Sequence, residues 1–193
     1  MTLDWHTILG TASGIILAVI LIPYIRSVLY GPTRPNPVSW GGWMVLAGIA
    51  TAAQFSAGAS WTLLVPVMTT ISTAVIFLLS LRAGRAGFMK VDGAAAILGA
   101  AAIGSWTFTE EPLWALIFVV AADLFVSVPT VVKTYGKPLS EPALLWFLYF
   151  FGVLLAIAAS TKFDVYNLLY PVYAVLVSGA IWLLALRGRL KRI

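Results

Sequence analysis

The sequence of 193 residues contains no cysteine and a single histidine, His6. The absence of cysteine excludes disulfide bridges, zinc–thiolate sites and a cysteine nucleophile. One histidine excludes a metal site built from several histidines of this chain. Charged residues are also scarce, because they make up 10% of the sequence, whereas a soluble domain has about 25%. So few charges cannot cover a surface that faces water, and the composition therefore indicates a membrane protein.

Hydrophobic residues make up 61% of the sequence and gather in long runs. Because a bilayer core of about 30 Å needs about 20 helical residues, we predict an all-α membrane protein with seven transmembrane helices. The predicted helices cover residues 7–30, 39–57, 61–82, 91–108, 113–134, 143–160 and 164–186. The first run is preceded by Asp4 and by no Lys or Arg, unlike a cleavable signal peptide, so we expect a retained helix.

The basic residues are distributed unequally between the segments that connect these helices. If the N-terminus lies outside, eleven of the twelve basic residues fall on the cytoplasmic side, and Lys162 is the exception. The eleven are Arg26, Arg34, Arg82, Arg85, Lys90, Lys133, Lys137, Arg187, Arg189, Lys191 and Arg192. The positive-inside rule therefore predicts an outer N-terminus and a cytoplasmic C-terminus in a plasma (inner) membrane. The same distribution assigns the excess positive charge to topology and not to nucleic-acid binding.

The two halves of the sequence resemble each other when one is moved along the other by 106 residues, or by 105 after a slip of one residue. The matched pairs include Pro23 with Pro129, Pro32 with Pro138, Trp40 with Trp146, Pro66 with Pro171, and Arg82 with Arg187. We predict a three-helix bundle in residues 1–85, a linker helix in 86–110, and a second bundle with a basic cytoplasmic tail in 111–193. The odd linker makes the two copies parallel, an arrangement found in transporters.

This pattern of three helices, one linker helix and three helices resembles the SWEET and PQ-loop superfamily of membrane transporters. In each half, a proline near the cytoplasmic end of the first helix is followed by a polar loop, in "PYIRSVLYGPTRPNPVSWGGW" from Pro23 and "PTVVKTYGKPLSEPALLW" from Pro129. The Pro-Gln dipeptide is absent. SWEET sugar carriers hold an asparagine in both the third and the seventh helix, and here only Asn167 is present.

Asp123 is the strongest functional signal, because it lies close to the bilayer midplane. It is ~15 Å from the inner end and ~18 Å from the outer end of its predicted helix, where a charge costs about 2.5 kcal/mol or more. We predict that it faces the interface between the bundles, as a proton-coupling group or as the counter-ion of a cationic substrate. The resemblance to PQ-loop exporters, which use an acidic residue in this helix, implies proton coupling. The alternative is a structural carboxyl that joins two helices.

Polar and aromatic residues of the second, third and seventh helices are candidates for a substrate pocket. They are Gln54, Thr69, Thr70, Thr73, Asn167, Tyr170 and Tyr173. The alternative for these residues is the packing of helices through small polar side chains. We expect the paired prolines Pro23, Pro129, Pro66 and Pro171 to be hinges, and Trp40 and Trp146 to be gate residues. An aromatic belt at the membrane interface also accounts for the two tryptophans.

The sequence favours a secondary transporter of a small polar solute, such as a sugar or an amino acid, with Asp123 as the coupling group. The alternative is a membrane receptor or assembly factor that has the SWEET fold without transport. No nucleotide-binding motif, nucleophile–base pair or paired carboxylates occur within the predicted helices, so we expect neither an enzyme nor a cofactor. The seventh helix contains no lysine for a retinal Schiff base. Protons and the lipid bilayer are the other expected partners, and self-association is left open.

Overall fold

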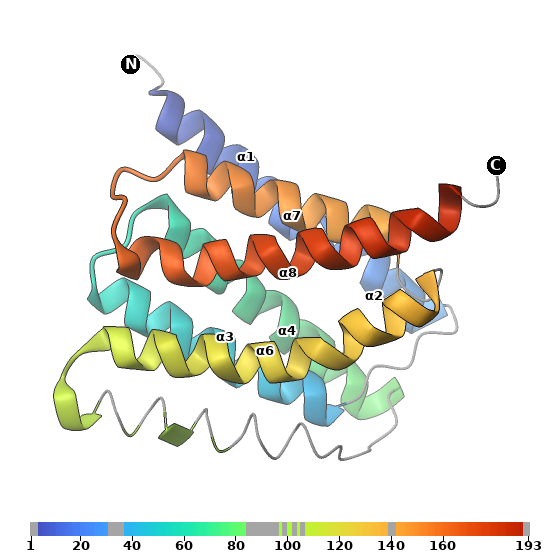
Figure 1. Ribbon diagram of the computed structural model, residues 1–193, viewed down its shortest axis with the longest axis horizontal. Coiled ribbons are helices and arrows are strands. Elements are labelled where there is room, and N and C mark those ends of the chain that lie inside the picture. Colours follow the sequence, from blue (N-terminus) through green and yellow to red (C-terminus); the bar gives the residue numbers. More distant parts are fainter. Residues whose placement is uncertain are drawn as a thin grey trace.

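The computed structural model describes residues 4–30, 37–83, 107–138 and 142–190, with the isolated positions 97, 100, 101 and 104. All regular structure in this part of the chain is helical. The long helices lie side by side, and the two ends of the chain lie at opposite ends of the bundle (Figure 1). The predicted all-α class is therefore confirmed for the described residues.

The first half contains α1 (Trp5–Val19), α2 (Leu21–Tyr30), α3 (Pro37–Ser56), the 3-10 turn η1 (Trp61–Leu63) and α4 (Leu64–Ala83). The second half contains α6 (Pro112–Gly136), α7 (Ala143–Ala158) and α8 (Val165–Leu190). The helix limits agree within four residues with six of the predicted helices. Most of the predicted linker helix, 91–108, lies outside the described residues.

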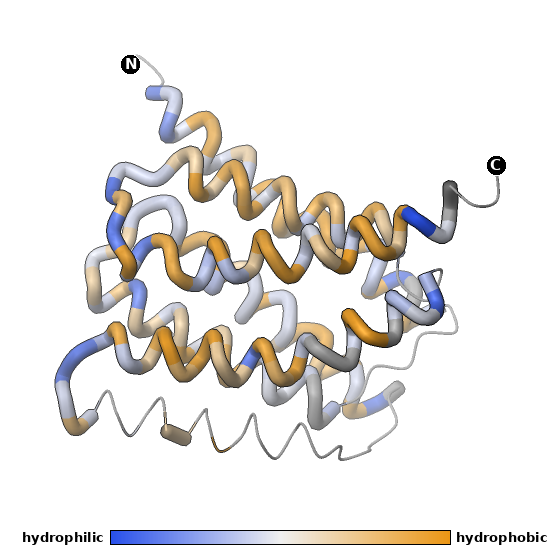
Figure 2. The backbone as a smooth tube through the Cα atoms, viewed as in Figure 1, coloured by the Kyte–Doolittle hydropathy of each residue, from blue (hydrophilic) through white to orange (hydrophobic). Residues whose placement is uncertain are grey.

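Four helical stretches are long and apolar enough to cross a membrane, namely Trp5–Tyr30, Trp61–Arg82, Pro112–Gly136 and Val165–Gly188. A shorter apolar helix, Ala143–Ala158, lies beside them. Hydrophobic residues dominate the middle of the helices, and hydrophilic residues gather toward the two ends of the bundle (Figure 2). This distribution is that of a membrane protein, because apolar side chains alone remain stable in contact with lipid tails.

Proline explains why the first span is divided into two helices. The ring of Pro23 clashes with the carbonyl of Val19, four residues earlier, and Pro23 has no N–H to bond to that carbonyl. The helix α1 therefore ends at Val19. Pro66 lies in the first turn of α4, where a missing N–H costs little. Pro171 lies inside α8, which continues past it. Pro129 lies within α6, but its side chain is outside the described part of the structure.

The helices close into a ring. α1 packs against α4 and α7, α3 packs against α4 and α6, and α8 packs against α6 and α7. Alanines that are fully covered lie at these contacts, including Ala50, Ala53, Ala122 and Ala156. Such small side chains let helix backbones approach closely, which is the main source of packing energy between helices in lipid.

The connections at the two ends of the ring carry different charges. At the end with the N-terminus, the Lys162 ammonium donates to the Gly58 carbonyl at 2.7 Å and the Tyr166 hydroxyl donates to Glu111 at 2.9 Å. At the other end, the Arg187 guanidinium donates to the Tyr135 carbonyl and lies 4.8 Å from the centre of its ring. The described acidic residues other than Asp123 belong to the first of these ends, which we call the acidic end; the opposite end is called the basic end.

Candidate functional site

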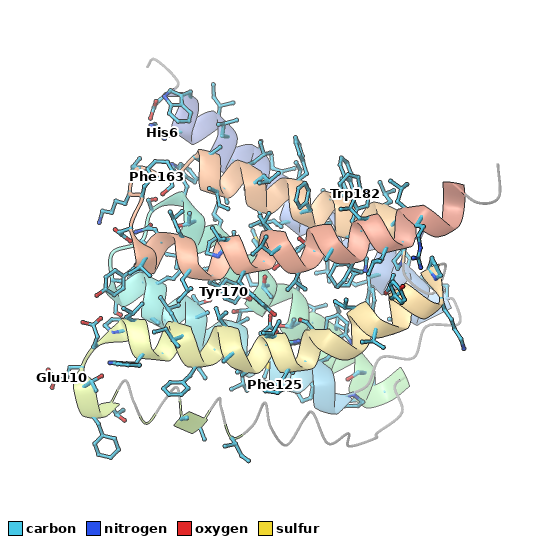
Figure 3. All side chains as sticks on the ribbon, viewed as in Figure 1. His6, Glu110, Phe125, Phe163, Tyr170 and Trp182 are labelled. Atoms are coloured by element: carbon cyan, nitrogen blue, oxygen red, sulfur yellow. The ribbon has the colours of Figure 1, made fainter. Side chains whose placement is uncertain are left out.

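A cavity of about 440 Å³ lies inside the ring, and every α-helix that the structure describes contributes to its wall. Five of the eight predicted coupling and pocket residues line it together, namely Asp123, Thr69, Thr73, Tyr170 and Tyr173, and so do the two predicted gate residues, Trp40 and Trp146. Tyr170 is 4% exposed and lies between α8 and α6, whereas Phe125 is 50% exposed on the outer side of α6 (Figure 3). The Asp123 side chain therefore faces the interior, on the opposite side of α6 from Phe125.

Two aromatic residues hold the Asp123 carboxylate. The Tyr173 hydroxyl and the Trp43 indole N–H lie close to it and favour its charged form. Tyr173 also lies 3.1 Å from the Ser127 hydroxyl, one helical turn beyond Asp123 on α6. The carboxylate thus lies where α3, α6 and α8 approach one another.

The threonine and serine hydroxyls of the cavity bond mainly to their own helices. Thr69 donates to the Val65 carbonyl at 2.8 Å and Thr73 donates to the Thr69 carbonyl at 2.7 Å. Ser178 donates to the Ala174 carbonyl at 2.6 Å. Thr69 Oγ1 also lies 3.0 Å from the Tyr149 hydroxyl. Because each hydroxyl has one proton, these side chains present oxygen lone pairs to the cavity and few donors.

Three predicted pocket residues lie outside this cavity. Thr70 donates to the Pro66 carbonyl at 2.7 Å and lies 3.1 Å from the Thr51 hydroxyl of α3. Gln54 donates to the Tyr166 carbonyl at 2.9 Å. Asn167 belongs to a polar cluster nearer the acidic end. The structure therefore uses all three in contacts between helices and connecting turns.

Asn167 is the centre of that polar cluster, which we call the Asn167 cluster and which also contains Ser60, Thr62, Ser160 and Asp164. Its side-chain oxygen accepts from Ser60 N at 2.9 Å and from Thr62 Oγ1 at 3.0 Å, and its nitrogen donates to Asp164 at 2.9 Å. Ser60 Oγ lies 3.0 Å from Ser160 Oγ. Asn167, Thr62 and Ser160 are 0% exposed. The cluster joins the turn before α4 to the turn before α8 and closes the acidic end.

Asp164 caps α8, since its carboxylate accepts from both the backbone and the side-chain nitrogen of Asn167. These two hydrogen bonds, the side-chain one being the stronger influence, hold the pKa of Asp164 below its ordinary value. The charged form of the cap is therefore the stable one at neutral pH, and it suits the positive end of the α8 dipole.

The cavity extends from Asp123 toward the basic end and reaches the surface there. Pro142, which lines the cavity, is exposed at the start of α7. Trp40 and Trp146 line the same portion, and the Trp40 ring lies 5.2 Å from Tyr24 and 5.1 Å from Trp43 between centroids. The cavity is thus open at the basic end and closed by the Asn167 cluster at the acidic end.

Several lining residues were not predicted as site residues from the sequence. They include Tyr24, Trp43, Met68, Ser127 and Tyr149. Ser127 was recognisable, because it lies four residues after Asp123 and therefore on the same helical face. Trp43 and Tyr149 lie near helix ends, where an interfacial aromatic belt gives the same sequence signal.

Among the described residues, no group of three His, Cys, Asp or Glu side chains is arranged to hold a metal ion. Comparisons of the chain with models of protein families, with curated proteins and with solved structures find no match. The chemical character of the site is therefore taken from its own residues. It is a cavity of ligand size with one carboxylate, several aromatic walls and an opening at one end.

Proposed function

We propose that this protein is a secondary transporter of a small solute that works by alternating access, with Asp123 as the coupling group. The observation that carries the proposal is the cavity itself. It holds a carboxylate within the membrane-spanning part, is open at the basic end, and is closed at the acidic end by the Asn167 cluster, in which Asn167, Thr62 and Ser160 are buried. Intramembrane carboxylates that face a cavity mark ion and substrate pathways.

The proposed transporter consists of two parallel three-helix repeats, α1–α4 and α6–α8. Burial supports this, since Ala50 and Ala53 are buried and Ala52 is exposed, and their partners 106 residues later, Ala156, Ala159 and Ala158, follow the same order. Helix contacts agree as well, because α3·α4 matches α7·α8, α1·α4 matches α6·α8, and α1·α7 matches α3·α6. These correspondences favour a pseudo-two-fold axis along the bundle.

The cavity lies where such an axis would pass. Its wall contains residues from matched positions of both repeats, which are Leu17 with Asp123, Trp40 with Trp146, Trp43 with Tyr149, Met68 with Tyr173, and Thr73 with Ser178. A site between two repeats that rock against each other is the arrangement of many secondary transporters.

We further propose that all seven predicted helices span the membrane, with the acidic end outside and the basic end in the cytoplasm. In this arrangement α3 and α7 cross beside the four longer spans, since they connect the same two ends of the ring. The described basic side chains Arg26, Arg82 and Arg187 then lie on the cytoplasmic side and agree with the positive-inside rule. Predicted helix 91–108 would restore the direction of the second repeat.

Alternating access requires the closed end to open and the open end to close. In the proposed cycle, the bonds of Ser60 and Thr62 to Asn167 break, while Trp40 and Trp146 approach each other at the cytoplasmic end. The prolines Pro23, Pro129 and Pro171 are hinge candidates, since each removes a backbone hydrogen bond from its span. Pro66, in the first turn of α4, is a hinge candidate at the junction of α4 with η1. A proton or a bound cation neutralises Asp123 during the change, because an unpaired charge in a closed cavity is costly.

Reconstitution in liposomes tests the proposal. A panel of sugars, amino acids and amines is loaded inside, and counterflow of the labelled solute is measured with and without a pH gradient. Asp123→Asn retains hydrogen bonding but cannot titrate. We expect this variant to lose pH-driven accumulation, whatever exchange it retains at equal pH. Full pH-driven transport by the variant would exclude Asp123 as the coupling group, and a receptor would move no solute in either case.

A further inference from the structure

We propose that the cavity binds a monovalent organic cation, a quaternary or protonated amine with an apolar body, between Asp123 and the surrounding aromatic rings. This inference rests on the proposed transport function and specifies its substrate class. Of the lining side chains that the structure describes, Asp123 is the one acidic residue, and none is Lys, Arg or His. The carboxylate therefore has no protein counter-charge in this wall, and a bound cation provides one.

The aromatic walls favour the same ligand. Trp40 and Trp43 form a corner, with ring centroids 5.1 Å apart and an interplanar angle of 75°. Tyr170 and Tyr173 form a second wall, with centroids 6.3 Å apart. The face of an aromatic ring is electron-rich, and cations within about 6 Å of a centroid are attracted by about 0.5–2 kcal/mol. Perpendicular rings beside a carboxylate suit a cation that also has an apolar surface.

The hydrogen-bonding capacity of the wall disfavours other solutes. Thr69, Thr73 and Ser178 already donate their hydroxyl protons to backbone carbonyls. An anion, or the carboxylate of an amino acid, would be repelled by Asp123 and would meet no positive side chain among the described lining residues. A sugar would leave several hydroxyls without partners in a mainly apolar cavity, which costs about 1–3 kcal/mol for each stranded group. An ammonium head group needs only the acceptors that the wall presents.

Size is also consistent with this ligand class. Pockets for small molecules measure about 300–1,000 Å³, and this cavity measures about 440 Å³. It therefore has room for an amine with one ring or several short alkyl arms. Because the cation and a proton neutralise the same carboxyl group, they compete for it. Binding of the cation to the protonated site releases one proton to solution, which links cation movement to a pH gradient.

Binding to the purified full-length chain in detergent tests this inference without requiring transport. The probes are benzyltrimethylammonium, a permanent cation; benzyl alcohol, which is neutral; and phenylalanine, a zwitterion with the same ring. Isothermal titration calorimetry and quenching of tryptophan fluorescence measure affinity. We expect the cation to bind at least about tenfold more tightly than either of the others, which corresponds to 1.4 kcal/mol. Equal or tighter binding of benzyl alcohol or phenylalanine would overturn the inference.

Variants then locate the site. Asp123→Asn should weaken binding of benzyltrimethylammonium by at least about tenfold, and Trp43→Leu should weaken it severalfold. Glu111→Gln is the matched control, because it removes a carboxylate outside the cavity and should leave the affinity unchanged. An Asp123→Asn variant that elutes as a folded monodisperse protein and binds benzyltrimethylammonium normally contradicts the inference. If the variant does not fold, the relative affinities of the three probes for the unmodified chain test the inference instead. If the cation binds but is not transported into liposomes, the binding site is supported and the transport function is refuted. If another solute is transported and the cation does not bind, the transport function is supported and the cation site is refuted.

Discussion

Asn167→Leu tests whether the Asn167 cluster holds the acidic end together. The substitution keeps a side chain of similar volume but removes the oxygen that accepts from Ser60 N and Thr62 Oγ1. Thr62 is 0% exposed, so water cannot readily replace the lost acceptor. Leaving a buried donor unsatisfied costs about 1–3 kcal/mol. Two stranded donors predict a loss of about 2–6 kcal/mol in the free energy of unfolding.

Thr62→Val is the matched comparison, since it removes one hydroxyl of nearly the same shape. Asn167 then keeps its bonds to Ser60 N and to Asp164, so the expected loss is about 0.5–1.5 kcal/mol. The double variant should lose less than the sum of the two single losses, because Thr62 cannot be stranded when its hydroxyl is already absent. A coupling energy of about 0.5–1.5 kcal/mol is expected for groups in direct contact.

Reversible unfolding in mixed micelles of mild detergent and dodecyl sulfate, followed by circular dichroism, measures these free energies. The chain has no cysteine that could complicate the equilibrium. If Asn167→Leu unfolds at the same dodecyl sulfate fraction as the unmodified protein, the cluster does not stabilise the acidic end. Strict additivity in the double variant would show that the Thr62–Asn167 bond is absent in solution.

Three further predictions concern packing, pH and topology. A Cβ at Gly10 would overlap the Trp61 ring, whereas one at Gly14 would lie 3.6 Å from Leu64, so Gly10→Ala should destabilise by about 1–3 kcal/mol and Gly14→Ala should not; equal unfolding midpoints would refute this packing. Because the folded state lowers the pKa of Asp164, its contribution is complete above the ordinary value of 3.8 and is lost as pH falls through the lower folded pKa. Thermal unfolding at pH 6 and pH 3 should therefore differ more in the unmodified protein than in Asp164→Asn, and an equal difference would count against the cap. Single cysteines at Ser56 and Thr161 should react with an impermeant maleimide on intact cells and one at Gly136 should not, and the reverse pattern would invert the proposed orientation.

Helix positions were largely predictable from the sequence because their signals are local. An apolar run of about 20 residues between polar turns identifies a membrane helix without knowledge of its neighbours. Asp123 could be located at mid-helix by counting residues, and its position on the side of α6 opposite Phe125 follows from the cost of exposing a carboxylate to lipid. In both cases the deciding physical term belongs to one helix and its solvent.

Which residues line the cavity was less predictable, because this depends on how each helix is rotated toward its neighbours. Thr69, Thr70 and Thr73 are close in sequence, but Thr70 points toward Thr51 of α3 and bonds there. Asn167 and Tyr170 lie one turn apart on α8, yet Asn167 serves the Asn167 cluster while Tyr170 lines the cavity. The rotation of each helix about its axis is set by packing against its neighbours, and the periodicity of one helix does not determine it.

The chemistry of the cavity arises where the two halves of the sequence differ. If the halves were identical, a carboxylate at position 17 would face the cavity together with Asp123, and two like charges in a medium of low dielectric would repel strongly. Such a pair would share one proton or bind two positive charges. Leu17 lies at that position instead, and the cavity therefore has an apolar wall matched to its charged wall. Met68 with Tyr173 shows the same division, because the tyrosine places a hydroxyl close to Asp123 and its counterpart has no proton to donate. The proposed repeat would account for the shape of the cavity, while the departures from it leave one negative charge among the described lining residues, which a single proton or a single monovalent cation neutralises.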